Sequence, residues 1–413
     1  MEMPSNKPKA IVFAHPFEGR TSYFLAGLSH FYELIIYYNA SKRFRFSFQV
    51  FYKWQYAGDV KFIKCNSPDE VLDAEGSFDA AFVFVESMFE HLKWFEGQAE
   101  ITEFVKKLKK RVGKLVWMEI GEHQWFMVPE DPFWETVDYV VKGQVFRPEY
   151  EHLMHDLSRI HLFQGKLPEE HQRLKVGNLK FEMGKWRHKI LPLPFTPCIT
   201  EQKSLDWPGV DRIYDFSGNT RTFGNGLLRY DVIKAIKEGL ENEFRYSFEF
   251  DPIGQVTNLS EDKKPNDIYL KPYIGKLLFK LKYGRFFYPQ PLYVHNLSKT
   301  RVYLGLGFTF SSLRTADVWG SGSVLVNFSL AKCDYGIPVE EGKHYISIGE
   351  RDEMTDDNVV FKKEYSEQVV EKVRDILKDR DRQNEIIGNQ YKLYREYFSS
   401  PEQFVKKIFI EKI

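Results

Sequence analysis

The sequence predicts an α/β protein with two doubly wound domains and a helical C-terminus, and three observations support this. Short β-branched or aromatic runs alternate with longer segments of helical period, which is typical of parallel strands joined by crossover helices. The length of 413 residues favours two domains. The proline-rich stretch Leu191–Asp206 lies near the middle of the chain, where proline favours an extended linker.

We therefore expect a first domain over residues 1–190, a linker over 191–208, a second domain over 209–380 and terminal helices over 381–413. In the first half, Arg43–Trp54 alternates polar and apolar residues, which predicts a half-buried strand or hairpin. Apolar spacing and a basic last turn predict a helix over Ala99–Arg111. The predicted strands there are Ala10–Ala14, Lys61–Cys65, Ala80–Val85, Lys114–Ile120 and Val137–Val141.

The second half repeats the alternation of strands and helices and then becomes helical. The predicted strands are Gly209–Phe216, Phe244–Phe250, Arg301–Leu306, Ser323–Phe328 and His344–Ile348. The predicted helices are Arg229–Glu243, Arg314–Gly320, Ser366–Arg380, Gln383–Tyr397 and Pro401–Ile410.

Composition excludes several classes of protein. The 58 Lys and Arg balance 58 Asp and Glu, which argues against a nucleic-acid binder that works by bulk charge and against an acidic disordered chain. The odd, widely spaced Cys65, Cys198 and Cys333 suggest neither a disulfide framework nor a zinc site. Without a signal peptide or a long apolar run, we expect a soluble, cytoplasmic protein.

Ligands of open α/β sheets bind beyond the carboxyl ends of strands, so the segments that follow predicted strands are the candidate binding segments. In the first such segment, Gly218 permits a turn and Arg221 can pair with phosphate, while hydroxyl and amide groups come from Ser217, Asn219 and Thr220. A second segment runs from Gly305 through Gly307 to Arg314 and opens a short helix containing Asp317. Helix N-terminal amides with an arginine can bind an anion, although a glycine-rich turn and a helix cap explain the same residues.

Two further groups are candidates. The segment Tyr335–Tyr345 contains Glu341, Gly342 and Tyr345, and a charged turn is the alternative explanation. In the first half, a histidine or carboxylate after a strand could act as a general base, although a structural role is the more common one. The candidates there are His15, Glu18, Glu119, Glu122 and His123.

Several motifs of other enzyme classes are missing. The sequence has no HExxH, CxxC, GxSxG or GxxxxGK[ST] motif, which argues against zincins, α/β-hydrolases and P-loop enzymes. No GxGxxG follows the first strand, so a dinucleotide-dependent oxidoreductase has little support. The DxD string at Asp379–Asp381 lies in a highly charged helical stretch and predicts a solvated face, not a metal site.

The segments YDFSGNTR, LSKTRVYLGLGFTFSSLRTADVWGSGSVLVNF and YGIPVEEGKHYISI resemble the C-terminal half of GT-B glycosyltransferases, the exostosin-like and group 1 types most closely. The resemblance covers roughly Val210–Tyr345 and implies two Rossmann-like domains facing a central cleft, with the last helices packing back on the first, acceptor-side domain. It places Arg314 and Arg221 at the donor diphosphate, Asp317 at the ribose in place of the usual glutamate, and Glu341, Gly342 and Tyr345 in an EG-x-x-Y loop.

The implied activity is transfer of a sugar from a nucleotide-sugar to a glycan or lipid-linked glycan, in cell-surface polysaccharide synthesis, without a metal or other cofactor and without nucleic acid as a partner. Arginines and helix N-terminal amides would stabilise the leaving diphosphate. An inverting enzyme would take its base from His15, Glu18 or Glu122. Peripheral contact with the inner membrane face through Lys276–Arg285 is an added expectation. A nucleotide-sugar epimerase and a non-catalytic glycan-binding module remain alternatives.

Overall fold

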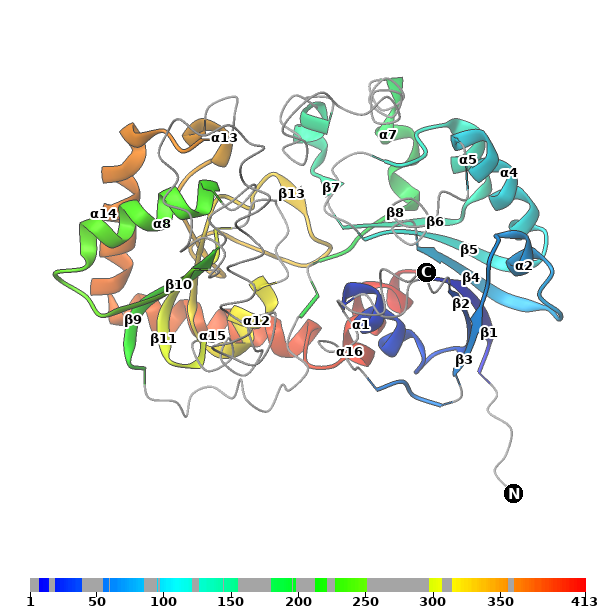
Figure 1. Cartoon of the computed structure of the whole chain (residues 1–413), viewed down its shortest axis with the longest axis horizontal. Coiled ribbons are helices and arrows are strands. Elements are labelled where there is room, and N and C mark those ends of the chain that lie inside the picture. Colours follow the sequence, from blue (N-terminus) through cyan, green and yellow to red (C-terminus); the bar gives the residue numbers. More distant parts are fainter. Residues whose placement is uncertain are drawn as a thin grey trace, which may run out of the picture. The chain divides into compact units, whose positions relative to one another are not determined.

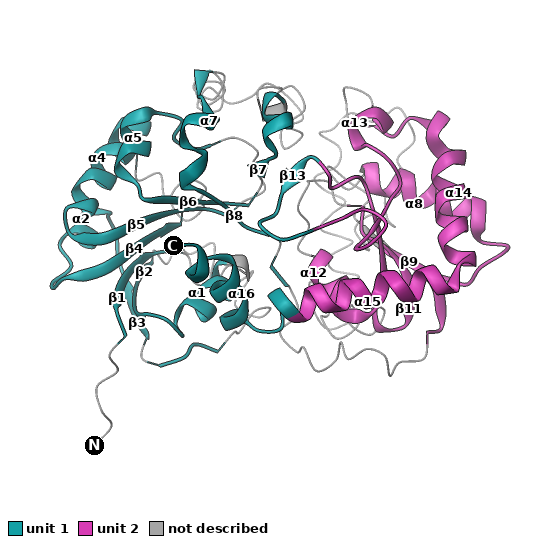
Figure 2. Ribbon diagram, turned by 180° about the vertical axis from the view of Figure 1, so that it is seen from behind, with its two compact units in different colours: residues 1–200, 332–338, 396–413 teal, residues 201–331, 339–395 magenta. Residues whose placement is uncertain are grey.

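The computed structural model describes residues 7–14, 19–38, 55–58, 60–84, 95, 97–120, 126–143, 145–154, 180–194, 196–197, 212–220, 227–250, 297–306, 314–355 and 360–413 (Figure 1). The chain forms two compact units (Figure 2). Unit 1 comprises residues 1–200, 332–338 and 396–413, and unit 2 comprises residues 201–331 and 339–395.

Unit 1 is built on a seven-stranded parallel sheet of order β3-β2-β1-β4-β5-β6-β8. Its first six strands follow the order 3-2-1-4-5-6 of dinucleotide-binding Rossmann sheets. Most central strands are nearly continuous apolar runs because both of their faces are covered. The strands are β1 (Lys9–Phe13), β2 (Glu33–Tyr38), β3 (Val60–Lys64), β4 (Phe78–Phe84), β5 (Val112–Glu119), β6 (Tyr139–Lys142) and β8 (Ile190–Pro192).

The helices of unit 1 include α4, whose buried Ile101, Phe104, Val105 and Leu108 recur every three or four residues. A short antiparallel pair joins β7 (Val145–Phe146) to β13 (Cys333–Asp334). The helical segments are α1 (Gly19–Leu28), α2 (Asp69–Leu72), α4 (Gln98–Lys109), α5 (Asp131–Thr136), η1 (Pro148–Met154), α7 (Met183–Trp186), η3 (Arg187–Lys189), α16 (Pro401–Ile408) and η8 (Ile410–Lys412).

The C-terminal helix α16 packs tightly on α1. A Cβ atom built on Gly27 would lie 2.0 Å from the carbonyl oxygen of Pro401, so only glycine allows this approach. The ring centroids of Tyr23 and Phe404 lie 5.3 Å apart in an edge-to-face pair. The hydroxyl of Ser400 accepts a hydrogen bond from the backbone amide of Gln403 and caps α16, which begins with proline.

Unit 2 has a five-stranded parallel sheet of order β10-β9-β11-β12-β14, which corresponds to the order 2-1-3-4-5 of flavodoxin-like sheets. Its strands are β9 (Tyr214–Thr220), β10 (Tyr246–Phe250), β11 (Thr300–Leu304), β12 (Val324–Asn327) and β14 (Ile346–Ser347). Its helical segments are α8 (Leu227–Leu240), α12 (Arg314–Ser321), α13 (Arg351–Met354), η7 (Lys363–Tyr365), α14 (Ser366–Lys378) and α15 (Arg380–Tyr397).

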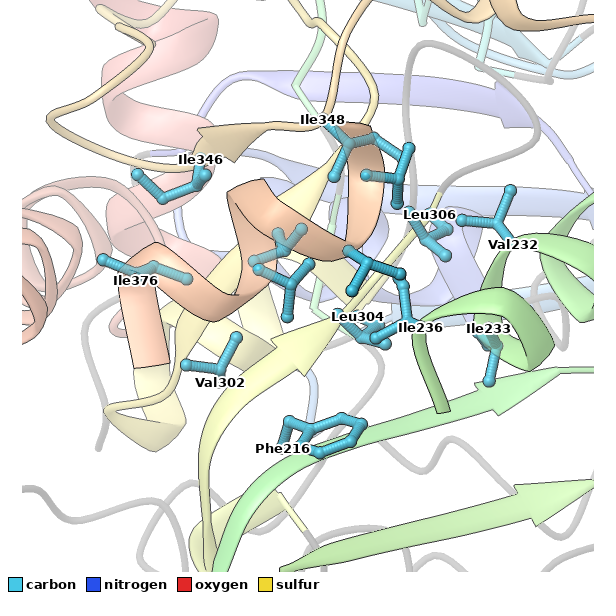
Figure 3. Packing of buried hydrophobic residues seen from close by; sticks show 14 of the residues in the cluster. Phe216, Val232, Ile233, Ile236, Val302, Leu304, Leu306, Ile346, Ile348 and Ile376 are labelled. Atoms are coloured by element: carbon cyan, nitrogen blue, oxygen red, sulfur yellow. The ribbon is translucent and has the colours of Figure 1, made fainter. Parts of the chain in front are cut away.

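One face of the unit 2 sheet forms the apolar core. Alternate residues of β9 and β11, including Phe216, Val302 and Leu304, pack with Ile236 of α8 and Ile376 of α14 (Figure 3). Helices α8 and α14 are themselves in contact, since a Cβ atom on Gly239 would lie 2.6 Å from a methyl carbon of Val370. The remaining alternate residues face the opposite side of the sheet and include polar groups.

The two doubly wound parallel sheets confirm the predicted α/β class. Three local predictions differ from the structure. The segment after Phe216 is not a loop, because β9 continues to Thr220, paired in parallel with β10 as far as Thr220 and with β11 as far as Gly218. Both β2 and α1 were missed, and Leu191, placed at the start of the linker, lies in β8. The predicted strand Arg43–Trp54 lies outside the described residues.

Candidate functional site

The candidate site is the carboxyl edge of the unit 2 sheet, at its topological switch point. The strand order reverses between β9 and β11, and in open α/β sheets the crevice at such a reversal is the usual ligand site. The register aligns Gly218 with Leu304 and aligns Leu304 with Val326. Val326 in turn aligns with Ile346, so these four residues lie at one level of the sheet. The residues that follow them form its carboxyl edge: Asn219 and Thr220, Gly305 and Leu306, Asn327 and Phe328, and Ser347 and Ile348.

Leu306 holds an unusual backbone conformation at this edge. Its φ is +36°, and among the described residues no other non-glycine residue has a positive φ. A branched side chain strains the backbone there, and such strain persists only where surrounding contacts impose it. Leu306 is fully buried in the core of unit 2 (Figure 3). The core therefore fixes the direction in which the chain leaves β11 toward the segment that precedes α12.

Two buried hydroxyl groups lie on the elements that flank the switch point. Ser217 is on β9 and Thr315 is in the first turn of α12, and they are 3% and 1% exposed. Neither hydroxyl has a hydrogen-bond partner among the residues that the structure describes. A buried polar group without a partner is costly, so such groups in native proteins need an explanation, and a ligand that supplies the partner is one.

Helix α12 carries two of the sequence-predicted residues. Arg314 is its first residue, as predicted, and the structure describes its backbone position only. Asp317 lies in the first turn and is fully buried (0% exposed). Gly320, farther along α12, packs against the ring of Tyr394, where a Cβ atom would lie 2.7 Å from a ring carbon. This contact holds α12 against α15.

The segment predicted as an EG-x-x-Y loop forms a compact turn before β14. Gly342 has a φ of +76°, and its amide donates to the carbonyl of Tyr345 at 2.8 Å. The Tyr345 hydroxyl accepts a hydrogen bond from the amide of Leu330 at 2.9 Å, and burial raises its pKa to about 12. Tyr345 therefore ties this turn to the segment after β12, whereas Glu341 is exposed.

His344 in the same turn is buried and neutral. Its Nδ1 atom accepts a hydrogen bond from the amide of Glu340 at 3.1 Å, which requires an unprotonated nitrogen. Burial and then the charge of Lys343 lower its pKa, while Glu340 opposes them. Gln390 of α15 donates to the carbonyl of His344 at 2.7 Å, so the turn is also fixed to α15.

Sequence reasoning missed the residues that follow β14 at the same edge. Gly349 has a φ of +138°, and Glu350 and Arg351 follow it into α13. The Arg351 side chain is only 6% exposed and pairs with Asp352 at 3.3 Å. A glycine followed by charged residues directly after an apolar strand is the signal in the sequence that marks this position.

In unit 1, the carboxyl end of β5 holds a buried ion pair. Glu119 lies 3.0 Å from the ammonium group of Lys142 on β6, in direct register. Its other carboxylate oxygen accepts hydrogen bonds from the indole of Trp117 and the amide of Met127, both at 3.0 Å. With its contacts already made inside the protein, Glu119 has a structural role and is not an available general base.

The remaining predicted residues fall in two groups. The backbones of Asn219 and Thr220 lie in β9, but their side chains are not described. Outside the described residues are His15, Glu18, Glu122, His123, Arg221, Gly307 and the basic segment Lys276–Arg285. The roles expected of all these residues remain predictions, as do the donor contacts of Ser217, Gly218, Asp317, Glu341, Gly342 and Tyr345.

Within the ranges given above, no three His, Cys, Asp or Glu side chains converge in an arrangement that could hold a metal ion. Over the same ranges, no helix combines the length and the apolar character that crossing a membrane requires.

Solved structures share this architecture, although no protein-family model and no curated protein matches the sequence. An α-glucosyltransferase in complex with UDP and a 13-mer DNA containing a central A:G mismatch aligns over 98% of this chain and 97% of its own, with 10% identity and a TM-score of 0.52.

Two further structures align over similar lengths. AviGT4, a glycosyltransferase involved in avilamycin A biosynthesis, covers 98% of this chain and 97% of its own, with 8% identity and a TM-score of 0.45. A UDP-glucosyltransferase from Polygonum tinctorium covers 99% of both chains, with 10% identity and a TM-score of 0.44. The strand orders of the two units and the full-length likeness to the α-glucosyltransferase show that this chain has the GT-B fold.

Proposed function

We propose that this chain is a glycosyltransferase that moves a sugar from a nucleotide-sugar donor to a glycan or lipid-linked glycan acceptor. The observation that carries the proposal is the pair of buried hydroxyls, Ser217 and Thr315, on the elements flanking the switch point of unit 2. Glycosyl transfer releases a nucleoside diphosphate, and hydroxyl donors in a buried site can bind its oxygens.

We assign the nucleotide-binding site to unit 2, and UDP is the nucleotide that we favour. The GT-B fold of the chain and the UDP bound by the α-glucosyltransferase structure support UDP as the donor nucleotide. In this arrangement Arg314 and the N-terminal amides of α12 stabilise the charge on the departing diphosphate. Arg221 is the expected second phosphate contact.

The acceptor side of the reaction is assigned to unit 1, with His15, Glu18 or Glu122 as the base of an inverting enzyme. Glu119 is excluded from that role by its pairing with Lys142. Metal independence, a cytoplasmic location and peripheral contact with lipid-linked acceptors belong to the same proposal. A role in polysaccharide synthesis follows from the choice of acceptor.

A thermal-shift panel tests the proposal. UDP, GDP, CDP, ADP and their sugar conjugates are added at millimolar concentration. At least one should raise the Tm, because a ligand that binds only the folded protein stabilises it, and the increase should grow with ligand concentration. Release of the nucleoside diphosphate is then measured with a glycan, a lipid-linked glycan and duplex DNA as acceptors. Failure of every nucleotide to shift the Tm contradicts the proposal, and transfer to DNA alone contradicts the choice of acceptor.

A further inference from the structure

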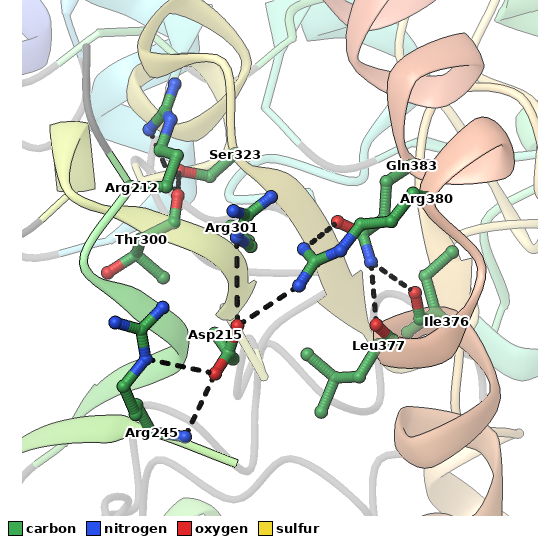
Figure 4. Close-up of polar contacts among 10 residues, drawn as sticks. All are labelled: Arg212, Asp215, Arg245, Thr300, Arg301, Ser323, Ile376, Leu377, Arg380 and Gln383. Atoms are coloured by element: carbon green, nitrogen blue, oxygen red, sulfur yellow. Dashed lines mark hydrogen bonds and ion pairs between the residues drawn. The ribbon is translucent and has the colours of Figure 1, made fainter.

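A cluster of arginines lies at the opposite, amino edge of the unit 2 sheet. Asp215 and Arg301 are each the second residue of their strands, β9 and β11, while Arg245 immediately precedes β10 and Arg380 begins α15 (Figure 4). Because the strands are parallel, their amino ends share one edge. The backbone amide of Asp215 donates a hydrogen bond to the carbonyl of Arg245 at 2.8 Å, so these strand starts adjoin. This edge is separate from the candidate nucleotide site.

Three guanidinium groups surround the single carboxylate of Asp215. Its Oδ1 atom lies 3.2 Å from Nη2 of Arg380 and 3.7 Å from Nε of Arg301. Its Oδ2 atom lies 3.6 Å from Nε of Arg245 and accepts a hydrogen bond from the Arg245 amide at 3.0 Å. One negative charge therefore faces three positive charges.

Among the described residues, the two acidic groups that most closely precede Arg245 in the sequence do not remove this excess, because both are paired elsewhere. Glu241 pairs with Lys237 at 3.4 Å, and Glu243 pairs with Arg374 at 3.0 Å. Among the described residues, the ion pairs of Asp215 therefore leave an excess of two positive charges in this cluster. The repulsion is evident at Arg301, whose pKa is lowered first by burial and then by Arg380, with Asp215 opposing and Arg245 adding to the effect.

The cluster also has side-chain N–H groups from which none of the described residues accepts a hydrogen bond. Over the described ranges, no hydrogen bond is formed by the side chain of Arg245 or Arg301, whose Nε atoms approach Asp215 only at ion-pair distances. Figure 4 shows their terminal amino groups directed away from that carboxylate. Each guanidinium offers five N–H donors in a planar fork, which suits the oxygens of a phosphate group.

By contrast, both terminal amino groups of the nearby Arg212 are bonded to backbone carbonyls. Its guanidinium donates to the carbonyls of Leu297, Ser298, Thr300 and Ser321, at 2.6–3.2 Å. It therefore closes the end of the sheet and contributes charge without offering a fork to a ligand. Arg212 thus has a structural role, which distinguishes it from the three arginines at Asp215.

We propose that Arg245, Arg301 and Arg380 form an oxyanion site that binds a phosphate group at the amino edge of the unit 2 sheet, apart from the nucleotide site. Asp215 holds the three side chains together, and the bound phosphate balances the two excess charges. The phosphate is either a free anion or part of a lipid headgroup, since both present the same oxygens.

The test uses the full chain and isothermal titration with inorganic phosphate and pyrophosphate, with saturating UDP present and at constant ionic strength. Saturable binding is expected, and Arg245→Gln should weaken it roughly tenfold, the loss typical of one charge-assisted contact. Arg245 is 66% exposed, so this change leaves the fold intact. The matched control is Lys234→Gln, which removes one positive charge from an exposed position of α8.

Equal binding by wild type and Arg245→Gln overturns the proposal, as does an equal loss in Lys234→Gln, which would indicate only bulk charge. Arg380→Gln provides a second variant at a partly exposed position and should show the same selective loss. Co-sedimentation with phosphatidylglycerol or phosphatidylcholine vesicles then identifies the source. Arginine-dependent binding to the anionic vesicles assigns the site to a lipid headgroup, and its absence together with phosphate binding assigns it to a free anion.

Discussion

Glu119 and Lys142 form an ion pair across β5 and β6 with a separation of 3.0 Å, and their side chains are 3% and 1% exposed. The ammonium group of Lys142 also lies 5.4 Å from the ring centre of Phe126. Burial and the ion pair with Lys142 thus explain why a carboxylate, that of Glu119, lies at the end of β5, without a catalytic role. The same pair organises the carboxyl end of the unit 1 sheet.

Removing one member of this pair should strongly destabilise the protein. Lys142→Met leaves the Glu119 carboxylate buried without its counter-ion, and the expected loss is about 3–5 kcal/mol of unfolding free energy. Urea denaturation followed by fluorescence measures it. The double variant Lys142→Met, Glu119→Gln should recover most of the loss, because both charges are then absent and the amide carbonyl still accepts the hydrogen bonds of Trp117 and Met127. A double variant as unstable as the single one would refute this explanation.

The packing of α16 on α1 gives a second prediction. Gly27→Ala places a methyl group 2.0 Å from the Pro401 carbonyl oxygen, so α16 must shift and the protein should lose at least about 1 kcal/mol of stability. Gly388→Ala is the control, because a Cβ atom there meets nothing within 4 Å. It lies inside α15, where alanine should stabilise by about 0.5–1 kcal/mol. Opposite signs in thermal unfolding are expected, and similar effects would contradict the packing.

A third prediction concerns pH. The pKa of His344 is lowered by burial and by Lys343, so the folded protein binds a proton there less readily than the unfolded chain, whose value is about 6.5. Unfolding then takes up a proton below that pH, and stability should fall as the pH drops through about 6.5 toward the lower folded value. Comparing Tm between pH 5 and 8 for wild type and His344→Gln tests this. An unchanged slope in the variant would assign the effect to other groups.

Tyr345 provides a fourth prediction. Tyr345→Phe removes the acceptor for the Leu330 amide and leaves that buried donor unpaired, at a cost of about 1–3 kcal/mol. Because the Tyr345 hydroxyl is already bonded inside the protein, we expect this loss in thermal stability, and the predicted donor contact would lower the affinity for UDP in addition. A large loss of UDP binding with normal stability would instead place Tyr345 in contact with the ligand.

Sequence patterns predicted the α/β class and most second-half elements because apolar runs and helical periods reflect burial directly. They failed at β9, since serine, glycine and asparagine disfavour strands in isolation. In the structure β11 pairs with β9 as far as Gly218, and β10 pairs with it as far as Thr220. They also missed β2, whose apolar run follows α1 after four residues.

The candidate site was predictable only in part. The strand–turn–helix pattern indicated α12 and its first residue, Arg314, because glycines and hydroxyls cluster before it. The positive φ of Leu306 was not predictable, since it results from core packing rather than from residue type. The arginine cluster at Asp215 escaped notice because its members are far apart in the sequence and meet only through strand register.

The central claim is that unit 2 binds a nucleoside diphosphate through the hydroxyls of Ser217 and Thr315. Isothermal titration with UDP should give saturable binding to wild type, and Ser217→Ala and Thr315→Ala should each weaken it roughly tenfold while leaving unfolding stability unchanged or slightly raised. Ser323→Ala, which removes a buried hydroxyl bonded to Leu297 and Thr300, is the control and should lower stability without changing affinity. Unaltered UDP affinity in both Ser217→Ala and Thr315→Ala would contradict the claim.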